Sequence, residues 1–149
     1  MLKINLSNFF IALVLLTNPT KALAFEEKDV RATIIKLGGV DKFLRLLVDS
    51  QSKNLPQQLD SETKLISIFA TDSTLHLTHQ LINTKSKSEL DKKFVDGFIK
   101  FQTSKVCTSP VGKIALTEFN AKYRYQYLGN SGESLIVFDV IKKNCMDLK

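Results

Sequence analysis

Four short segments of the chain are rich in apolar residues and predict strands, and residues 121–128 alternate strictly between apolar and polar side chains. Residues 64–70 (KLISIFA) and 74–82 (TLHLTHQLI) flank a turn at residues 71–74. Residues 121–128 (AKYRYQYL) and 133–141 (ESLIVFDVI) flank the turn sequence GNSG at residues 129–132. A period of two is typical of a strand with one buried face, and a short polar turn between two such runs is typical of a hairpin. The pattern therefore predicts two antiparallel hairpins.

The pairing of each hairpin decides which side chains share a face of the sheet. We predict that Ala70 pairs with Leu75 and that Tyr125 pairs with Ile136. These registers place one largely apolar set on a single face, which we interpret as the core: Ile66, Ile68, Leu75, Leu77, His79, Leu81, Tyr123, Tyr125, Tyr127, Ile136, Phe138 and Val140. A tyrosine stripe can be a ligand platform, but it is more often part of a core whose rim the hydroxyl groups reach.

The opposite face of the predicted sheet is also rich in apolar residues. It carries Leu65, Phe69, Ile82, Leu135, Val137 and Ile141, mixed with His76, Lys122, Arg124 and Asp139. Because monomers rarely expose so much contiguous apolar surface, either the N-terminal helices cover this face or another protein does. We favour coverage, which gives a helix–sheet–helix sandwich. In the alternative, the face is a partner surface that includes Leu135, Val137, Arg124 and Phe69.

Helical spacing of apolar residues marks most of the remaining chain. It runs through residues 26–37 and 40–53, which two glycines separate, and through residues 89–102. The glycine pair breaks the helix because each glycine costs about 1 kcal/mol relative to alanine. Ser109 and Pro110 begin a further short helix. The fold class is therefore α+β, with an antiparallel sheet of about four strands packed against three to four helices.

The first 24 residues have the three parts of a bacterial signal peptide. Lys3 gives a basic start, FFIALVLL at residues 9–16 is a short apolar region, and ALA at residues 22–24 offers small residues to a signal peptidase. The apolar region has roughly half of the 20 residues needed to span a bilayer. We predict a signal peptide at residues 1–24 and a single domain at residues 25–149. The mature protein is then periplasmic or secreted, with no membrane insertion.

The charge balance is mildly basic. The chain has 21 Lys and Arg against 15 Asp and Glu, which gives a formal net charge of +6. The lysines are interleaved with acidic or apolar residues, whereas nucleic-acid binding needs a clustered basic stripe. We therefore expect a solvated surface and no nucleic-acid partner.

The two cysteines, Cys107 and Cys145, bracket the second hairpin. Two cysteines in an oxidising compartment pair by default. A structural zinc site needs four ligands, and a redox motif needs two cysteines separated by two residues. Neither pattern fits a spacing of 38. We predict a structural disulfide that joins the end of the third helix to the end of the last strand.

The sequence contains no pattern typical of catalysis or cofactor binding. His76 and His79 point to opposite faces of one strand, which argues against a shared metal site, and His79 is best interpreted as a buried imidazole. GNSG lacks the spacing of a nucleophile elbow, and no phosphate-binding glycine loop or calcium loop is present. We predict no catalytic, cofactor-binding or metal-binding residues, no cofactor, and a protein that is not an enzyme.

Several segments together resemble a group of small exported bacterial proteins. These are LPQQLDSETKL after an amphipathic helix, a cysteine before a short helix, and YRYQYLGNSGESLIVFDV before a closing cysteine. Some proteins of this group are regarded as quorum-sensing-regulated virulence factors. The resemblance covers residues 40–145, with Asn120 where glycine is usual before the tyrosine strand. It implies an exported α+β domain without an established activity, and it transfers no site residues.

Two classes of function remain. The first is an exported, non-catalytic protein that binds an unidentified protein partner, as a virulence-associated factor or an accessory component of a secretion system. The alternative is an inhibitor of a host or competitor enzyme such as lysozyme. Inhibitors usually present a rigid, protruding loop. The tight loop at residues 129–133 has one acidic residue and no apolar anchor, which favours the first class.

Overall fold

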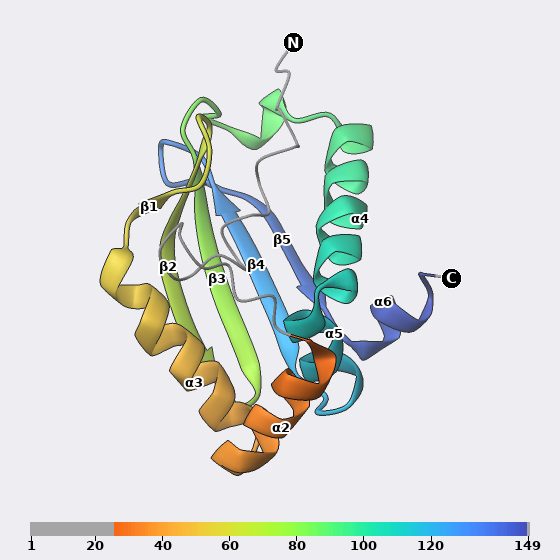
Figure 1. Cartoon of the computed structure of the whole chain (residues 1–149). Helices are drawn as coiled ribbons and strands as arrows, with labels where there is room; N and C mark the ends of the chain where they lie inside the picture. The colour runs from red at the N-terminus through yellow and green to blue at the C-terminus, as the bar shows by residue number, and fades with distance from the viewer. Residues whose placement is uncertain (1–25, 149) are drawn as a thin grey trace.

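A computed structural model describes residues 26–148 as one sheet with helices packed against it (Figure 1). The helices are α2 (Glu27–Leu37), α3 (Val40–Gln51), α4 (Lys92–Thr108), α5 (Pro110–Thr117) and α6 (Lys142–Met146). The strands are β1 (Gln57–Gln58), β2 (Thr63–Thr71), β3 (Thr74–Leu81), β4 (Lys122–Leu128) and β5 (Ser134–Val140), with the short 3₁₀ helices η1 (Ser52–Asn54) and η2 (Lys87–Glu89). The predicted signal peptide lies outside the described residues. Within residues 26–148, no helix has the length and apolar composition needed to cross a bilayer.

The α+β class is confirmed, but the sheet is mixed and has five strands in the order β1-β2-β3-β4-β5. The predicted hairpins are β2–β3 and β4–β5, and both are antiparallel. They meet through β3 and β4, which are parallel. A purely antiparallel sheet is therefore wrong. The difference arises because α4 and α5 carry the chain back along the sheet, so that β4 starts at the same end as β3.

Turn chemistry fixes the register of each hairpin. Ala70 pairs with Leu75, as predicted, and the two turn residues Asp72 and Ser73 both have positive φ, which is the geometry that two-residue hairpin turns require. In the second hairpin Tyr125 pairs with Phe138 instead of Ile136. This shift of two positions leaves residues 123–127 and 136–140 on their predicted faces, because the period of a strand is two. The tyrosine stripe is accordingly buried in the core.

Two irregularities in strand pairing change the predicted faces locally. Leu65 pairs with His79 and Ser67 pairs with Thr78, which leaves Ile66 without a partner. In the same way, Leu135 is left out between the residues of β5 that pair with Tyr127 and Leu128. An extra residue in one strand reverses the alternation on one side of it. Both Leu65 and Leu135 are buried in the core, so the prediction that they lie on the opposite face is wrong.

All of the longer helices lie on one side of the sheet (Figure 1). Their buried residues, such as Ile34, Leu44 and Ile114, form a single cluster with Leu77 and Tyr127 of the sheet. The other side of the sheet is not covered by any described helix, and we call it the outer face. The expected helix–sheet–helix sandwich is therefore wrong. A second helical layer is not needed to bury Leu65 and Leu135, because the two irregularities move these leucines to the side of the sheet that the helices cover.

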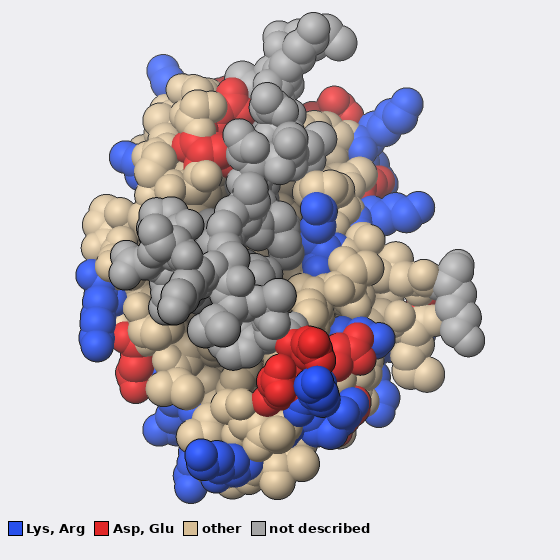
Figure 2. Space-filling view, in the orientation of Figure 1, with Lys and Arg blue, Asp and Glu red and all other residues tan. Residues whose placement is uncertain are grey.

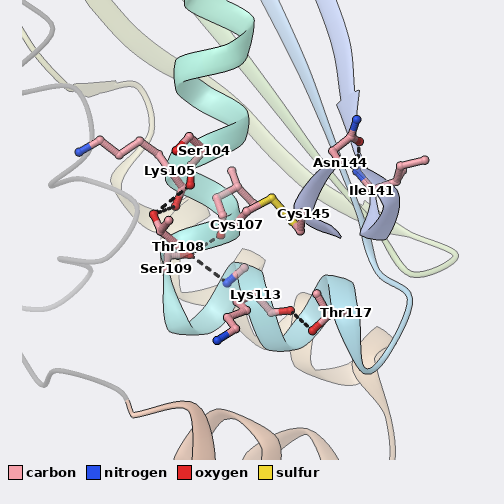
Figure 3. The surroundings of a disulfide bond; sticks show 12 residues. Ser104, Lys105, Cys107, Thr108, Ser109, Lys113, Thr117, Ile141, Asn144 and Cys145 are labelled. Carbon is pink, nitrogen blue, oxygen red and sulfur yellow. Dashed lines mark hydrogen bonds between the residues drawn. A yellow bond between two sulfur atoms is a disulfide. The ribbon is translucent and has the colours of Figure 1, made fainter. Parts of the chain in front are cut away.

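The disulfide joins Cys107 near the end of α4 to Cys145, with their Cα atoms 5.1 Å apart (Figure 3). The predicted pair is thus present. The prediction that Cys145 lies at the end of the last strand is wrong, because β5 ends at Val140 and Cys145 lies in α6. The Asn144 side chain accepts a hydrogen bond from the backbone N–H of Ile141 (2.8 Å) at the start of this helix. The disulfide therefore connects two helices, and the strand only indirectly.

The turn between α4 and α5 is tightly packed, and it gives a matched pair of glycine variants. A Cβ atom on Gly112 would lie 2.2 Å from the Val106 carbonyl oxygen, whereas one on Gly97, inside α4, would meet nothing within 4 Å. We expect Gly112→Ala to lower the free energy of unfolding by about 1–3 kcal/mol through overpacking. Gly97→Ala should raise it by about 0.5–1 kcal/mol through helix propensity. Urea unfolding followed by circular dichroism measures both, and equal shifts of the same sign would contradict the packing of this turn.

Candidate functional site

The outer face is organised in two rows that cross four strands. The first row runs Phe69, His76, Arg124 and Asp139, each paired with the next on the neighbouring strand. The second row runs Ser67, Thr78, Gln126 and Val137 in the same way. Neighbouring strands lie about 4.8 Å apart, so each row spans roughly three such spacings. Side chains from β2 to β5 therefore form one continuous surface.

The first row begins with an aromatic pair. The rings of Phe69 and His76 are stacked, with centroids 4.3 Å apart and an interplanar angle of 6°. The His76 Nε2 atom lies 2.9 Å from the Thr71 hydroxyl oxygen. Partial burial lowers the pKa of His76, and the positive charges of Arg124 and Lys122 lower it further. His76 is therefore neutral at pH 7, and the stacked pair presents an uncharged surface.

The other end of the row is an ion pair. Arg124 donates through Nε to Asp139 Oδ1 (2.7 Å) and through a terminal nitrogen to Oδ2 (2.8 Å). This bidentate hydrogen bond lowers the pKa of the Asp139 carboxyl, and the nearby charges of Arg124 and Lys122 act in the same direction. Beside this pair Val137 is 55% exposed, and Phe69 at the far end is 45% exposed. The outer face thus combines exposed apolar groups with a fixed ion pair.

Three of the four residues predicted for the partner surface meet on this face. Phe69, Arg124 and Val137 are exposed there, whereas Leu135 is in the core and cannot contact a partner directly. Ile141 at the end of β5 is also exposed. The structure therefore assembles the predicted surface with one residue fewer.

The buried polar residues offer little acid–base chemistry. His79 is stacked on Tyr127, with ring centroids 4.6 Å apart, and burial lowers its pKa to about 3. Burial raises the pKa of the tyrosines Tyr123, Tyr125 and Tyr127. All four side chains are consequently neutral across the physiological pH range. In the part of the chain that the structure describes, no three His, Cys, Asp or Glu side chains are grouped to hold a metal ion.

The charged side chains of the helical side are dispersed. Lys and Arg stand in separate groups around the visible face, with Asp and Glu between them (Figure 2). Among the described residues on this face there is no continuous basic stripe of the kind that follows a phosphate backbone.

A groove that the sequence did not reveal lies where β4 begins and β5 ends. It has a volume of about 620 Å³ and is lined by Asn120, Ala121, Lys122, Ile141, Lys142, Lys143, Met146 and Asp147. One wall is α6. The strand predicted over residues 133–141 runs on to Ile141, so the groove, which needs the chain to turn after Val140, was not predicted.

Comparison with known proteins identifies the fold. No protein-family model and no curated protein sequence matches the chain. Three solved structures share its fold. The pilotin EpsS of the Vibrio vulnificus type 2 secretion system has a TM-score of 0.58 and 13% identity, over 77% of this chain and 96% of the pilotin. The type II secretion system pilotin AspS of Vibrio cholerae has a TM-score of 0.57 and 18% identity, over 76% of this chain and 99% of the pilotin.

The third structure is a Pseudomonas aeruginosa protein proposed to be secreted. It has a TM-score of 0.61 and 13% identity, over 71% of this chain and 92% of that protein. At these identities the likeness establishes the fold alone. The three neighbours agree with the resemblance to small exported bacterial proteins in general terms. The link to quorum sensing stays a prediction.

Proposed function

We propose that the chain is an exported, non-catalytic protein that serves a secretion apparatus as an accessory component by binding one of its protein parts. The observation that carries this proposal is the fold, which the chain shares with two type 2 secretion pilotins over more than nine-tenths of their length. The predicted signal peptide supports a periplasmic or secreted location.

The outer face is the docking surface in this proposal. Protein interfaces combine apolar anchors with arginine at their centre and a polar surround. Here Phe69 and Val137 supply exposed apolar groups and Arg124 is held between them by Asp139. Because this geometry is fixed before binding, little side-chain entropy is lost when a partner docks.

The inhibitor alternative has less support because the loop that it needs is held down. The backbone N–H of Asn130 donates to the Thr84 carbonyl oxygen (2.8 Å). The Ser131 hydroxyl donates to the Lys85 carbonyl oxygen (2.8 Å). A loop fastened in this way to a neighbouring segment does not protrude into the cleft of an enzyme.

The proposal predicts that Val137→Lys separates binding from folding. Because the Val137 side chain is exposed, we expect the free energy of unfolding to change by no more than about 1 kcal/mol. Affinity for the apparatus should fall by about tenfold or more, since lysine places an unpaired charge in the interface. Ile35→Lys is the matched control, because Ile35 is 64% exposed on α2, away from the outer face.

The measurement has two parts. Photo-crosslinking from position 137 in cells, followed by mass spectrometry, should capture a component of the apparatus. Export of the apparatus substrate, measured in a deletion strain that carries each variant, should fall with Val137→Lys and not with Ile35→Lys. Equal export by the two variants would show that the outer face is not the docking surface, and normal export by the deletion strain would reject the function.

A further inference from the structure

The groove beside α6 has an apolar wall and a basic rim. Ile141 and Met146 are 41% and 60% exposed and both line it. Lys122, Lys142 and Lys143 contribute three positive charges, against one negative charge from Asp147. Within the described residues, neither Lys142 nor Lys143 forms an ion pair. The groove therefore exposes apolar surface and an excess of positive charge together.

The wall of the groove is held in place by the disulfide. A helix of five residues is not stable by itself. The bond from Cys145 to Cys107 fixes α6 against α4, and α6 also contacts α5. Figure 3 shows Cys145 directed toward α4 and Ile141 directed away from it. The disulfide thus presents the free side of α6 as a fixed surface. Little conformational entropy of α6 is therefore lost when a ligand binds.

The groove is continuous with the outer face. Lys122 and Ile141 line the groove. The Lys122 Nζ atom also lies 3.8 Å from the Asp139 Oδ2 atom. Asp139 in turn pairs with Arg124 in the first row of the outer face. A partner that covers the first row of the outer face can therefore extend an adjoining segment past Asp139 into the groove.

We propose that this groove binds an acidic amphipathic segment of the protein partner, in which apolar side chains alternate with clusters of Asp or Glu. The apolar side chains cover Ile141 and Met146, and the carboxylates pair with Lys142 and Lys143. Charge complementarity of this kind selects the partner and accelerates association. This inference rests on the proposed function and names the chemistry of the segment that the partner supplies.

The test uses the exported protein, purified in its oxidised form and labelled with ¹⁵N. The probe is a short synthetic peptide of Leu, Phe, Asp and Glu, and its control has Asn and Gln in place of the acids. We expect amide shifts at residues 120–122 and 141–147 with the acidic peptide, weakening as salt is added. The neutral peptide should bind more weakly by about tenfold, which corresponds to about 1.4 kcal/mol.

The decisive variant is Lys142→Glu with Lys143→Glu. Its matched control is Lys92→Glu with Lys93→Glu, an adjacent lysine pair at the opposite end of α4 that gives the same change in net charge. We expect about tenfold loss of peptide binding in the first variant and little change in the second. Equal losses, or shifts elsewhere on the protein, would overturn the proposal. So would preferential binding to phosphatidylglycerol vesicles, which would make the groove a membrane contact. If the peptide does not bind while Val137→Lys still abolishes export, the proposed function stands and this inference fails.

Discussion

Cys145→Ser is expected to lower the free energy of unfolding by about 4 kcal/mol. The disulfide closes a loop with a sequence separation of 38, and removing it restores the conformational entropy of that loop to the unfolded chain. Domains of this size are stable by only about 5–15 kcal/mol. The variant should therefore unfold at a much lower urea concentration. It should also lose the ordered position of α6, which the disulfide fixes.

Urea unfolding of the wild type, Cys107→Ser, Cys145→Ser and the double variant measures this effect. The three variants should be equally destabilised, because each lacks the same bond, and a reducing agent should bring the wild type to their level. Non-reducing peptide mapping should find Cys107 joined to Cys145 in the protein. Two free thiols, or a loss below about 1 kcal/mol, would contradict a structural role for this bond.

Below pH 6.5 the protein is expected to lose stability by about 1.4 kcal/mol for each pH unit, down to about pH 3. The cause is His79, whose pKa burial lowers to about 3 in the folded protein. In the unfolded chain the imidazole takes up a proton near pH 6.5, while in the folded chain it stays neutral. The unfolded state therefore binds more protons in this window, and acid favours unfolding.

His79→Leu isolates this contribution. Leucine has a similar volume and no titratable group, so the slope of unfolding free energy against pH should become shallow between pH 6.5 and pH 4. His76→Gln is the control, and it should retain most of the slope because His76 is only partly buried. Asp139 and Glu118, whose pKa values are lowered, add a loss at more acidic pH in every variant. An unchanged slope in His79→Leu would mean that the imidazole is protonated in the folded state.

Local patterns predicted that both hairpins form, and predicted the register of the first, because the interactions that form a hairpin are local. The turn of Asp72 and Ser73 sets the pairing of Ala70 with Leu75. The parallel contact between β3 and β4 joins segments that the chain brings together only after α4 and α5, and no local pattern encodes it. Asn120, which stands where the resembling proteins usually have glycine, has the left-handed backbone conformation that favours glycine, with a φ of 53°.

The outer face was partly predictable for the same reason. Alternation alone places Phe69, Arg124 and Val137 on one side of the sheet. It also places Leu135 there, because the four consecutive apolar residues 135–138 contain no alternation that would reveal the unpaired residue. The groove was not predictable, since it depends on the chain turning after Val140 and on the disulfide holding α6 back against α4.

The parallel pairing of β3 with β4 also sets the order in which the sheet can assemble. Each hairpin closes over a short turn, on a timescale of about 1–10 μs, whereas β3 and β4 meet only after α4 and α5 have been laid between them. Among the strand pairings, joining the two hairpins therefore carries the largest loss of chain entropy, and we expect it to limit the rate at which the sheet forms. Substitutions where Leu77 meets Tyr125 across this junction should slow folding. Strand β1 lies at the edge of the sheet beside β2 and pairs after the other strands have formed. Substitutions in β1 should therefore speed unfolding and leave the folding rate unchanged.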